Sequence, residues 1–256
     1  MSTLANAMEV LKLIARLRRD ITVTDAATEL QLPKSSASRT LSMMAEYGFL
    51  ERDAVTRAYR PGNLVMEASY HFRASRTATS LLEDALAALV RATGYTGYLN
   101  VLDGADSLVV QMRTGSCSLQ VYTPPGTRAP AYATSMGRAI LARLPKEAVA
   151  SLVGKRLGIR RGNVPRTWAD LSSRLDIGQA NGWSLSRGEF VQNVAGISAA
   201  VRDPATGTVH GIGIALPSHE LTDELVKRLS LRVRDAAMAV GKQIGDDYWL
   251  GFSQAA

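Results

Sequence analysis

The chain has 256 residues, of which 46% are hydrophobic and 21% are charged, so it is long enough for two globular domains and too apolar to be disordered. Its net charge of +7 and pI near 9.7 favour an anionic partner such as nucleic acid, although a basic pI can also serve solubility alone. A lone cysteine, Cys117, excludes an internal disulfide framework, and the lack of a membrane-length apolar run or a signal peptide predicts a soluble cytoplasmic protein without membrane contact.

The first predicted helix covers residues 4–17 and is expected to close the core of a small N-terminal domain. Its apolar residues at helical spacing are Leu4, Met8, Leu11, Ile14 and Ala15. The arginines at 16, 18 and 19 follow this stripe. They suit a solvated helix end, where cations interact favourably with the helix dipole, or a contact to a DNA backbone.

Two further helices are predicted between residues 22 and 48. Thr22-Val23-Thr24-Asp25 has the form of a capping box and opens a short helix. The next helix begins at Pro33, whose fixed φ suits a first helical position, and ends at a glycine stop, Gly48. At about 100° per residue, this helix has one polar face and one apolar face. The polar face holds Ser35, Ser38, Arg39 and Ser42, and the opposite face holds Ala37, Leu41 and Met44.

Residues 49–52 and 58–60 read as two short strands, with Arg57 near the tip between them. Capped helix, turn, two-faced helix and hairpin, in that order, form a winged helix-turn-helix. Small hydroxyl side chains permit close approach to a major groove, and arginine reaches guanine or phosphate. The predicted contacts to double-stranded DNA are Thr24, Lys34, Ser35, Ser36, Ser38, Arg39, Ser42, Arg57 and Arg60. The alternative is an ordinary three-helix bundle with a solvated polar face.

The stretch from Asn63 to Arg76 is predicted to form a connecting helix, because Leu64, Val65, Ala68 and Phe72 fall along one side. A single helix cannot bury such a stripe by itself. We therefore expect it to pack against a second subunit.

From Ser80 onward the sequence predicts helices alternating with strands. Ser80-Leu81-Leu82-Glu83 has the form of a second capping box, opening a helix that runs to Gly94. The expected strands are two hairpins, 98–102 with 108–112 and 197–203 with 208–216, and a further strand at 119–123. The other expected helices cover 136–144, 145–152, 167–182 and 222–245, with Thr167 and Thr222 as caps. This pattern predicts an α+β domain in which helices flank an antiparallel sheet.

No motif for catalysis or metal binding is found. His71, His210 and His219 lack a ligand at metal-binding spacing, so no metal or cofactor is predicted. Residues 133–137 contain half of a nucleophile elbow, but alanine replaces its first glycine and no base is evident nearby. The glycines of residues 211–215 lie in a strand pattern, where they permit close approach rather than phosphate binding. We predict no catalytic residue.

The run from Met8 through Pro61, especially LPKSSASRTLSMMAEYGFLERD and the later Tyr-Arg-Pro-Gly, resembles the IclR family of bacterial transcription regulators. The segments 130–139, 188–190 and 196–201 follow the order and spacing of that family's effector-binding domain. The resemblance implies a winged helix-turn-helix DNA-binding domain at 1–61, a linker helix at 62–77 and an effector-binding domain at 78–250. It also implies a homodimer, or a dimer of dimers, on operator DNA.

A ligand pocket is expected where a loop enters the helix at Ser135, because free backbone N–H groups there can hold a carboxylate or carbonyl oxygen; tight packing is the alternative role of Gly137. The resemblance maps effector contacts onto Ser135, Met136, Ser186, Gly196, Gly213 and Ala215. Several family members carry Asp, Cys or Ser at the last four positions. The smaller, less polar residues here favour a bulkier, aromatic effector over a tiny keto acid.

The aromatic residues that could stack on such a ring are Tyr98, Tyr122, Tyr132 and Trp183, although aromatics in strands more often belong to the core. Our hypothesis is a regulator whose affinity for a pseudo-palindromic operator changes when a small organic molecule occupies the second domain. Two alternatives stay open. One is a small-molecule-metabolising enzyme with an appended DNA-binding domain, and the other is a nonspecific architectural DNA-binding protein without an effector.

Overall fold

The computed structural model describes residues 3–17, 19–74, 77–158 and 163–252, without the side chains of 69–74, 77 and 155. The expectations for Arg18 and Arg76, and for the side chains of His71 and Phe72, therefore lie outside what the structure describes. The chain divides into two compact units, Met1–Thr77 and Ala78–Ala256. Within the described ranges, each helix is too short or too polar to traverse a bilayer.

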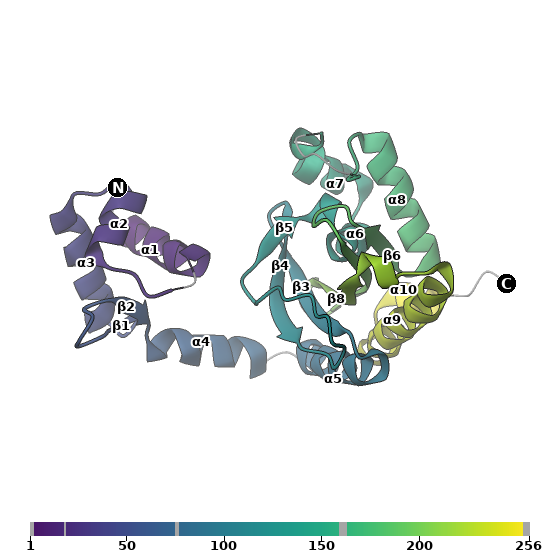
Figure 1. Cartoon of the computed structure of the whole chain (residues 1–256), viewed down its shortest axis with the longest axis horizontal. Coiled ribbons are helices and arrows are strands. Elements are labelled where there is room, and N and C mark those ends of the chain that lie inside the picture. The colour runs from purple at the N-terminus through teal and green to yellow at the C-terminus, as the bar shows by residue number, and fades with distance from the viewer. Residues whose placement is uncertain (1–2, 18, 75–76, 159–162, 253–256) are drawn as a thin grey trace. The chain divides into compact units, whose positions relative to one another are not determined.

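The N-terminal unit is a winged helix-turn-helix (Figure 1). Its elements are α1 (Thr3–Leu17), α2 (Val23–Glu29), α3 (Lys34–Glu46), the antiparallel hairpin of β1 (Leu50–Arg52) and β2 (Tyr59–Pro61), and α4 (Asn63–Ala74). The core is formed by the facing sides of the first three helices and by the hairpin. Its buried residues are Val10, Leu13, Ile14, Ile21, Ala26, Ala37, Leu41, Met44, Leu50 and Tyr59.

Helix α1 buries a face that only partly coincides with the one expected. Val10, Leu13 and Ile14 are buried, whereas Leu4 is 69% and Met8 is 41% exposed. Ala15, also assigned to the core from the sequence, is exposed too. The buried face follows the i, i+3, i+4 spacing from Val10, and this face packs against α3. The predicted stripe is thus wrong at Leu4, Met8 and Ala15, whereas Ile14 is buried and Leu11 packs against the core as expected.

The local signals around α2 and α3 agree with the structure. The Thr22 hydroxyl accepts a hydrogen bond from Asp25 N, and Asp25 in turn accepts one from Thr22 N, which confirms the capping box. Pro33 is the N-cap of α3 and not its first helical residue. Gly48 has φ of +76° just beyond the end of α3, as a glycine stop requires.

The second unit is built on an antiparallel sheet whose described strands lie in the order β5-β4-β3-β8-β7-β6. These strands are β3 (Thr96–Asp103), β4 (Asp106–Arg113), β5 (Arg128–Pro130), β6 (Ser184–Arg187), β7 (Val194–Arg202) and β8 (Val209–Pro217). The longer helices are α5 (Thr77–Thr93), α6 (Ser135–Leu141), α7 (Lys146–Val153), α8 (Trp168–Asn181), α9 (Asp223–Ile244) and α10 (Asp247–Gly251). Short 3₁₀ helices cover Ala131–Ala133, Gly154–Arg156 and Ser218–Glu220.

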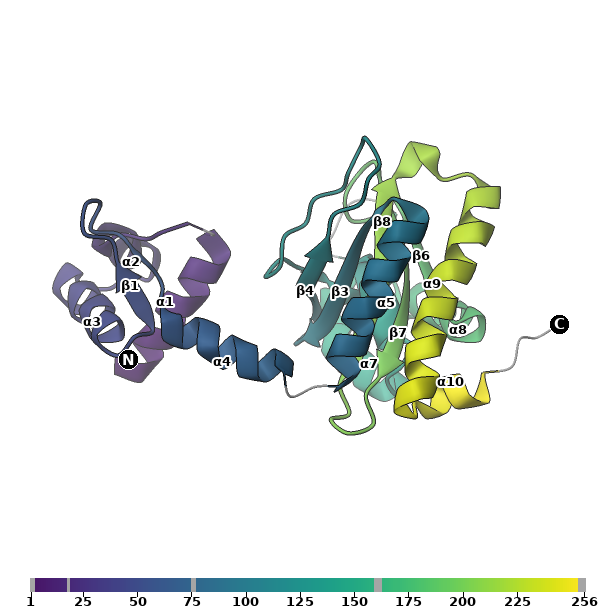
Figure 2. The same ribbon diagram turned by 90° about the horizontal axis from the view of Figure 1, so that it is seen from below.

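The sheet separates two cores. Helices α5 and α9 lie side by side over one face (Figure 2), where Leu86 and Val233 pack against Ile212 and Ile214 of β8. Successive residues of a strand point to opposite faces of the sheet. The β8 residues that alternate with Ile212 and Ile214 therefore point toward α6. This second face carries the small residues Gly211, Gly213 and Ala215, which leave space between β8 and α6.

Two predictions for the second unit are wrong. Residues 119–123 form no strand, and β5 at Arg128–Pro130 pairs with β4 instead. Pro124 and Pro125 cannot donate ladder hydrogen bonds, so the segment before them crosses the unit as an irregular loop. Ser80 lies inside α5, which begins at Thr77, because buried Ala78 extends the packed helix by a turn. Strand β6 and helix α10 were not predicted at all.

Candidate nucleic-acid interface and ligand pocket

The polar face of α3 is accessible along its length. Lys34, Ser35, Arg39 and Ser42 are exposed, while Ser36 and Ser38 are half-buried. The Arg39 guanidinium makes no hydrogen bond or ion pair to any described residue. On α2, Thr24 is also exposed. The apolar side of α3 is held in the core by Ala37, Leu41 and Met44. An exposed helix with small hydroxyls and a free arginine has the shape that major-groove binding requires.

The wing between β1 and β2 is ordered by Asp53. Its Oδ1 accepts hydrogen bonds from Val55 N at 2.9 Å and from Thr56 N at 2.7 Å, which closes the turn. Arg57 then adopts φ of +59° and is exposed at the tip. Arg60 differs from Arg57, because its guanidinium donates to both carboxylate oxygens of Glu51 across the hairpin. Of these two predicted DNA contacts, Arg57 is therefore the more available.

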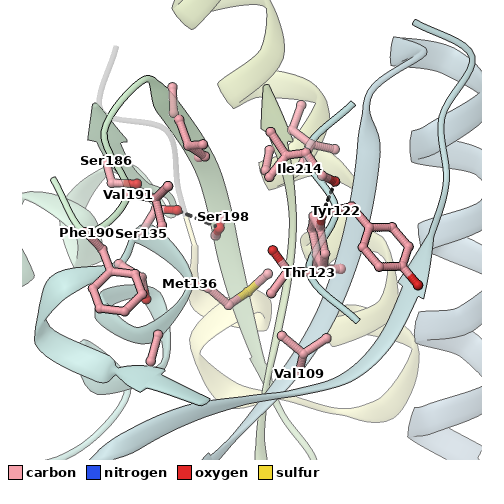
Figure 3. A pocket seen from close by; sticks show the side chains of 18 of the residues that line it. Val109, Tyr122, Thr123, Ser135, Met136, Ser186, Phe190, Val191, Ser198 and Ile214 are labelled. Carbon is pink, nitrogen blue, oxygen red and sulfur yellow. Dashed lines mark hydrogen bonds between the residues drawn. The ribbon is translucent and has the colours of Figure 1, made fainter. Parts of the chain in front are cut away.

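The second unit contains a cavity of about 910 Å³ on the α6 side of the sheet. Figure 3 shows Ser135, Ser186, Ser198, Phe190 and Val191 on one side of it and Tyr122, Thr123 and Ile214 on the other. Met136 and Val109 lie between these two groups (Figure 3). This volume is near the upper end of the range for small-molecule sites.

Two serine hydroxyls, of Ser135 and Ser186, lie beside Gly196 at one end of the pocket, and Ser198 joins them through Ser135. Ser135 Oγ and Ser198 Oγ are 3.0 Å apart and share a hydrogen bond (Figure 3). A Cβ added at Gly196 would lie 2.6 Å from Ser135 Oγ and 3.3 Å from Ser186 Oγ. Glycine at this position therefore leaves room for the Ser135 and Ser186 hydroxyls beside the strand, with Ser198 bonded to Ser135. Hydroxyls can both donate and accept, so this end can bind a polar group of either kind.

Five of the six residues predicted to contact an effector line this pocket: Ser135, Met136, Ser186, Gly196 and Ala215. Gly213 does not line it. Added at Gly213, a Cβ would lie 2.4 Å from Ser198 Oγ and 2.5 Å from Ile197 O, so this glycine permits close approach of β7 and β8 beneath the Ser198 side chain.

Of the four aromatic residues expected to stack on a ligand, two line the pocket and two do not. Tyr98 and Tyr122 line the pocket. Tyr132 is buried next to α7, where its hydroxyl donates to Arg156 O at 3.0 Å. Trp183 packs against the core beneath α5 and α9. The expectation that Tyr132 and Trp183 would stack on a ligand is therefore wrong, because both rings face other parts of the unit.

The loop that replaces the expected strand at 119–123 forms part of the pocket wall. The Tyr98 hydroxyl donates a hydrogen bond to Val121 O at 2.5 Å and so attaches this loop to β3. Burial raises the pKa of Tyr98, which keeps its hydroxyl protonated as a donor. The wall residues of this loop are Leu119, Gln120, Val121, Tyr122 and Thr123. The paired prolines after it were the sequence signal for a loop.

A second wall segment is held by a buried ion pair. Glu189 accepts from Arg138 Nη1 at 2.7 Å and from Nη2 at 3.2 Å, and the exposed fractions of the two side chains are 2% for Arg138 and 7% for Glu189. Arg138 also donates to the carbonyls of Tyr132 and Leu185. Burial lowers the pKa of Arg138, and Glu189 opposes that shift. Because Glu189 precedes Phe190 in the chain, this pair fixes Phe190 in the pocket wall.

The described wall residues include no Asp, Glu, Lys or Arg, and His219 is exposed. The described ranges also contain no cluster of three or more His, Cys, Asp or Glu that could hold a metal ion. Ser135 has Ser198 as its hydrogen-bond partner and not a histidine or carboxylate. The arrangement therefore provides shape, apolar area and hydroxyl groups, which are the properties of a binding site.

Comparison with known families matches both units. Residues 3–54 match the IclR helix-turn-helix domain, and residues 76–242 match the family described as bacterial transcriptional regulator IclR C-terminal. Among curated proteins, the chain is 27% identical over 244 residues to the HTH-type transcriptional regulator KipR of Bacillus subtilis, covering 95% of this chain and 97% of that protein. It is 26% identical to the acetate operon repressor of Salmonella typhimurium, covering 93% and 88% respectively.

Solved structures share the fold. An IclR transcriptional regulator from Alicyclobacillus acidocaldarius superposes with a TM-score of 0.83 at 19% identity, covering 97% of this chain and 98% of that one. An IclR homologue from Microbacterium hydrocarbonoxydans, complexed with 4-hydroxybenzoate, superposes with a TM-score of 0.82 at 20% identity, covering 95% and 99%.

Proposed function

Because the chain belongs to the IclR family of bacterial transcriptional regulators, we propose that it binds a specific operator and that a bulky, ring-containing organic effector in the second unit changes its operator affinity. In this proposal residues 1–61 bind DNA, 62–77 link the units and 78–250 bind the effector. The proposed effector class rests on the cavity of about 910 Å³, whose described wall residues include no Asp, Glu, Lys or Arg.

The size and polarity of the pocket support a ring-sized or larger effector. A two- or three-carbon keto acid would fill a small part of this volume and would meet no lysine or arginine in the described wall. Tyr98, Val109 and Phe190 instead offer apolar area, and burying such area drives the binding of apolar ligands. The structural relative holding 4-hydroxybenzoate is consistent with a ring in this class of pocket.

On the DNA side, we propose that α3 enters the major groove with Ser35, Ser38, Arg39 and Ser42, and that Arg57 contacts the adjacent backbone. Lys34 lies at the start of the same helix and suits a phosphate contact. A dimer would present two copies of this helix to half-sites one or more helical turns apart. The effector then regulates binding if it prefers one relative arrangement of the two DNA-binding units.

The test combines DNA footprinting with ligand screening on the full chain. We expect protection of a pseudo-palindromic site near the gene's own promoter, with affinity at fixed salt at least 1,000-fold above random DNA, in line with specific regulators. A thermal-shift panel of aromatic and aliphatic compounds should yield a ligand that also changes operator affinity. Equal affinity for all duplexes and no ligand in the panel would instead favour an architectural DNA-binding protein.

We also propose that the second unit has no catalytic role. The curated relatives are transcriptional regulators, and the Ser135 hydroxyl has no base as its partner among the described residues. Turnover of a bound compound that disappears in Ser135→Ala while binding persists would support the enzyme alternative.

A further inference from the structure

A second polar group lies in the pocket wall, away from the three serines. Asn100 of β3 is only 6% exposed, and Ser107 of the neighbouring strand β4 is 2% exposed. Asn100 Nδ2 donates to Ser107 Oγ at 2.9 Å, and both residues line the cavity. Asn100 Oδ1 has no hydrogen-bond partner among the described residues.

An unpaired amide oxygen in this position is costly. A buried polar atom that loses water without gaining a partner is destabilising, and such atoms are rare in native proteins. The other amide atom of Asn100 is already used by Ser107, so rotating the side chain would leave one of its two polar atoms unpaired in either orientation. The unpaired atom is therefore best explained by a partner that enters from the pocket.

The neighbouring groups indicate how that partner reaches the amide. Asn100 is paired in register with Gly211 of β8, and a Cβ added at Gly211 would lie 2.5 Å from Met136 Sδ. The Met136 thioether thus lies over the strand position beside Asn100. Methionine side chains adapt their rotamers readily, so a small movement of Met136 would open the amide to a ligand.

The order of the strands separates Asn100 and Ser107 from the end of the pocket that holds the three serines. Asn100 lies on β3 and Ser198 on β7, with β8 between them. Two strand spacings correspond to roughly 10 Å across the sheet. A ligand that reaches both groups must be longer than a single small acid, which agrees with the volume of the pocket.

We propose that Asn100, supported by Ser107, is a specificity-determining residue that accepts a hydrogen bond from an O–H or N–H group on the effector. This inference rests on the proposed effector site and narrows its ligand class. The effector is an elongated ring compound with a hydroxyl or amide donor at the end near β3 and a second polar group near Ser135. A compound in which this donor is capped by a methyl group leaves Asn100 Oδ1 unpaired and binds more weakly.

The experiment uses the full chain and pairs of ligands that differ by one group. Para-hydroxy aromatic amides and ketones, such as 4-hydroxybenzamide, are compared with their methyl ethers by isothermal titration calorimetry. One hydrogen bond to a buried amide corresponds to about tenfold in affinity, so the hydroxyl compounds should bind about tenfold tighter than their ethers. In Asn100→Leu this preference should fall to within about twofold.

Two controls isolate the amide. Val110→Ala alters the strand that carries Ser107, but Val110 is 41% exposed and does not line the cavity, so this variant should keep the full preference. If Asn100→Leu does not fold, Asn100→Ala serves instead. In the wild-type protein, the side-chain amide resonances of Asn100 should also shift more with the hydroxyl compound than with its ether.

The outcomes separate this inference from the proposed function. Compounds that bind with the same preference in wild type and in the Asn100 variants would overturn the role of Asn100 while leaving the effector site intact. Equal binding of hydroxyl compounds and ethers by the wild type would do the same, and would indicate that Asn100 meets only a water molecule. No binding by any pair would count against both the inference and the ring-containing effector.

Discussion

Arg39 and Arg60 are both exposed arginines of the N-terminal unit, yet their guanidinium groups differ in what they contact. Arg60 is paired with Glu51, and this hydrogen-bonded carboxylate raises the pKa of Arg60 further. Arg39 has no such partner among the described residues and lies among small hydroxyl side chains. A free guanidinium fork can bind both acceptors of a guanine, whereas a paired one must first break its ion pair.

Arg39 should therefore contribute to sequence discrimination. In Arg39→Ala, we expect operator affinity to fall by roughly 1–3 kcal/mol while affinity for random duplexes falls much less. Arg39→Lys preserves the charge but not the fork, so it should retain nonspecific binding and lose most of the discrimination. Gel-shift titrations against operator and random DNA at fixed salt measure both effects. Parental specificity in both variants would show that α3 does not read bases through this residue.

At the scale of single elements, helix α2 depends on its N-terminal cap. Asp25 accepts hydrogen bonds from Arg19, from Thr22 N and from Thr22 Oγ1. The Arg19 hydrogen bonds, followed by those from Thr22, hold the pKa of Asp25 well below its usual range. A lowered folded-state pKa means that this carboxylate stabilises the fold above about pH 4 and that the stabilisation is lost as the pH falls further.

Removing this cap should produce a pH-dependent loss of stability. Asp25→Asn is expected to lower the free energy of unfolding of the N-terminal unit by about 1 kcal/mol at pH 7. Below pH 4 the difference from wild type should shrink, because the Asp25 carboxylate of the unfolded chain then binds a proton while the folded one stays ionised. Denaturant unfolding at pH 7 and pH 3 measures both values, with Glu9→Gln in an exposed pair as the control. A difference that stays constant with pH would contradict this role of the carboxylate.

The buried pair between Arg138 and Glu189 joins α6 to the loop after β6. Replacing one partner leaves the other charge buried without compensation, which typically costs about 3–5 kcal/mol. We expect Glu189→Gln to destabilise the second unit by that amount and to weaken ligand binding, since Phe190 follows Glu189 in the wall.

Calorimetric unfolding of Glu189→Gln is best compared with Asp176→Asn. Asp176 pairs with Lys146 on the surface, where both side chains are half exposed, so its loss should cost less than about 1 kcal/mol. Similar melting temperatures for the two variants would argue that Arg138 finds another partner.

At the scale of the whole molecule, regulation requires that ligand binding in one unit changes how the other unit meets DNA. The exposed apolar side chains of the N-terminal unit include Leu4, Met8, Leu64 and Met66. Leu64 and Met66 lie on α4, the helix expected to pack against a second subunit, and are 40% and 63% exposed. Exposed apolar area on a connecting helix suits burial between protomers.

We therefore expect the full chain to be a dimer or a dimer of dimers in solution. The double variant Leu64→Glu, Met66→Glu should weaken this association and with it operator binding, because two half-sites no longer bind as one unit. Light scattering coupled to size exclusion gives the mass, and Lys12→Glu, which adds acidic charge on α1, serves as the control. A wild-type monomer that binds operator tightly would refute the dimer proposal.

Local sequence signals predicted most helices and most strands correctly. The capping box at Thr22 and the caps at Thr167 and Thr222 act through groups within three residues, so the sequence alone shows their pattern. The two faces of α3 follow from helical periodicity alone. The resemblance of residues 8–61 and of the later segments to the IclR family was enough to predict the architecture, and the matched domains confirm that family.

The tertiary structure decided which of these residues meet in the pocket. Gly213 of β8 is paired with Ser198 of β7, and both lie on the same face of the sheet. Only Ser198 lines the cavity, because its side chain covers Gly213. Tyr132 and Trp183 were placed wrongly for a similar reason, because the direction of each ring depends on packing. Asn100 and Ser107 gave no motif, since their pairing depends on the register of β3 against β4. The sequence by itself thus determined the helices and caps, which form through neighbouring residues. The contacts across the sheet that build the pocket depend on three-dimensional packing.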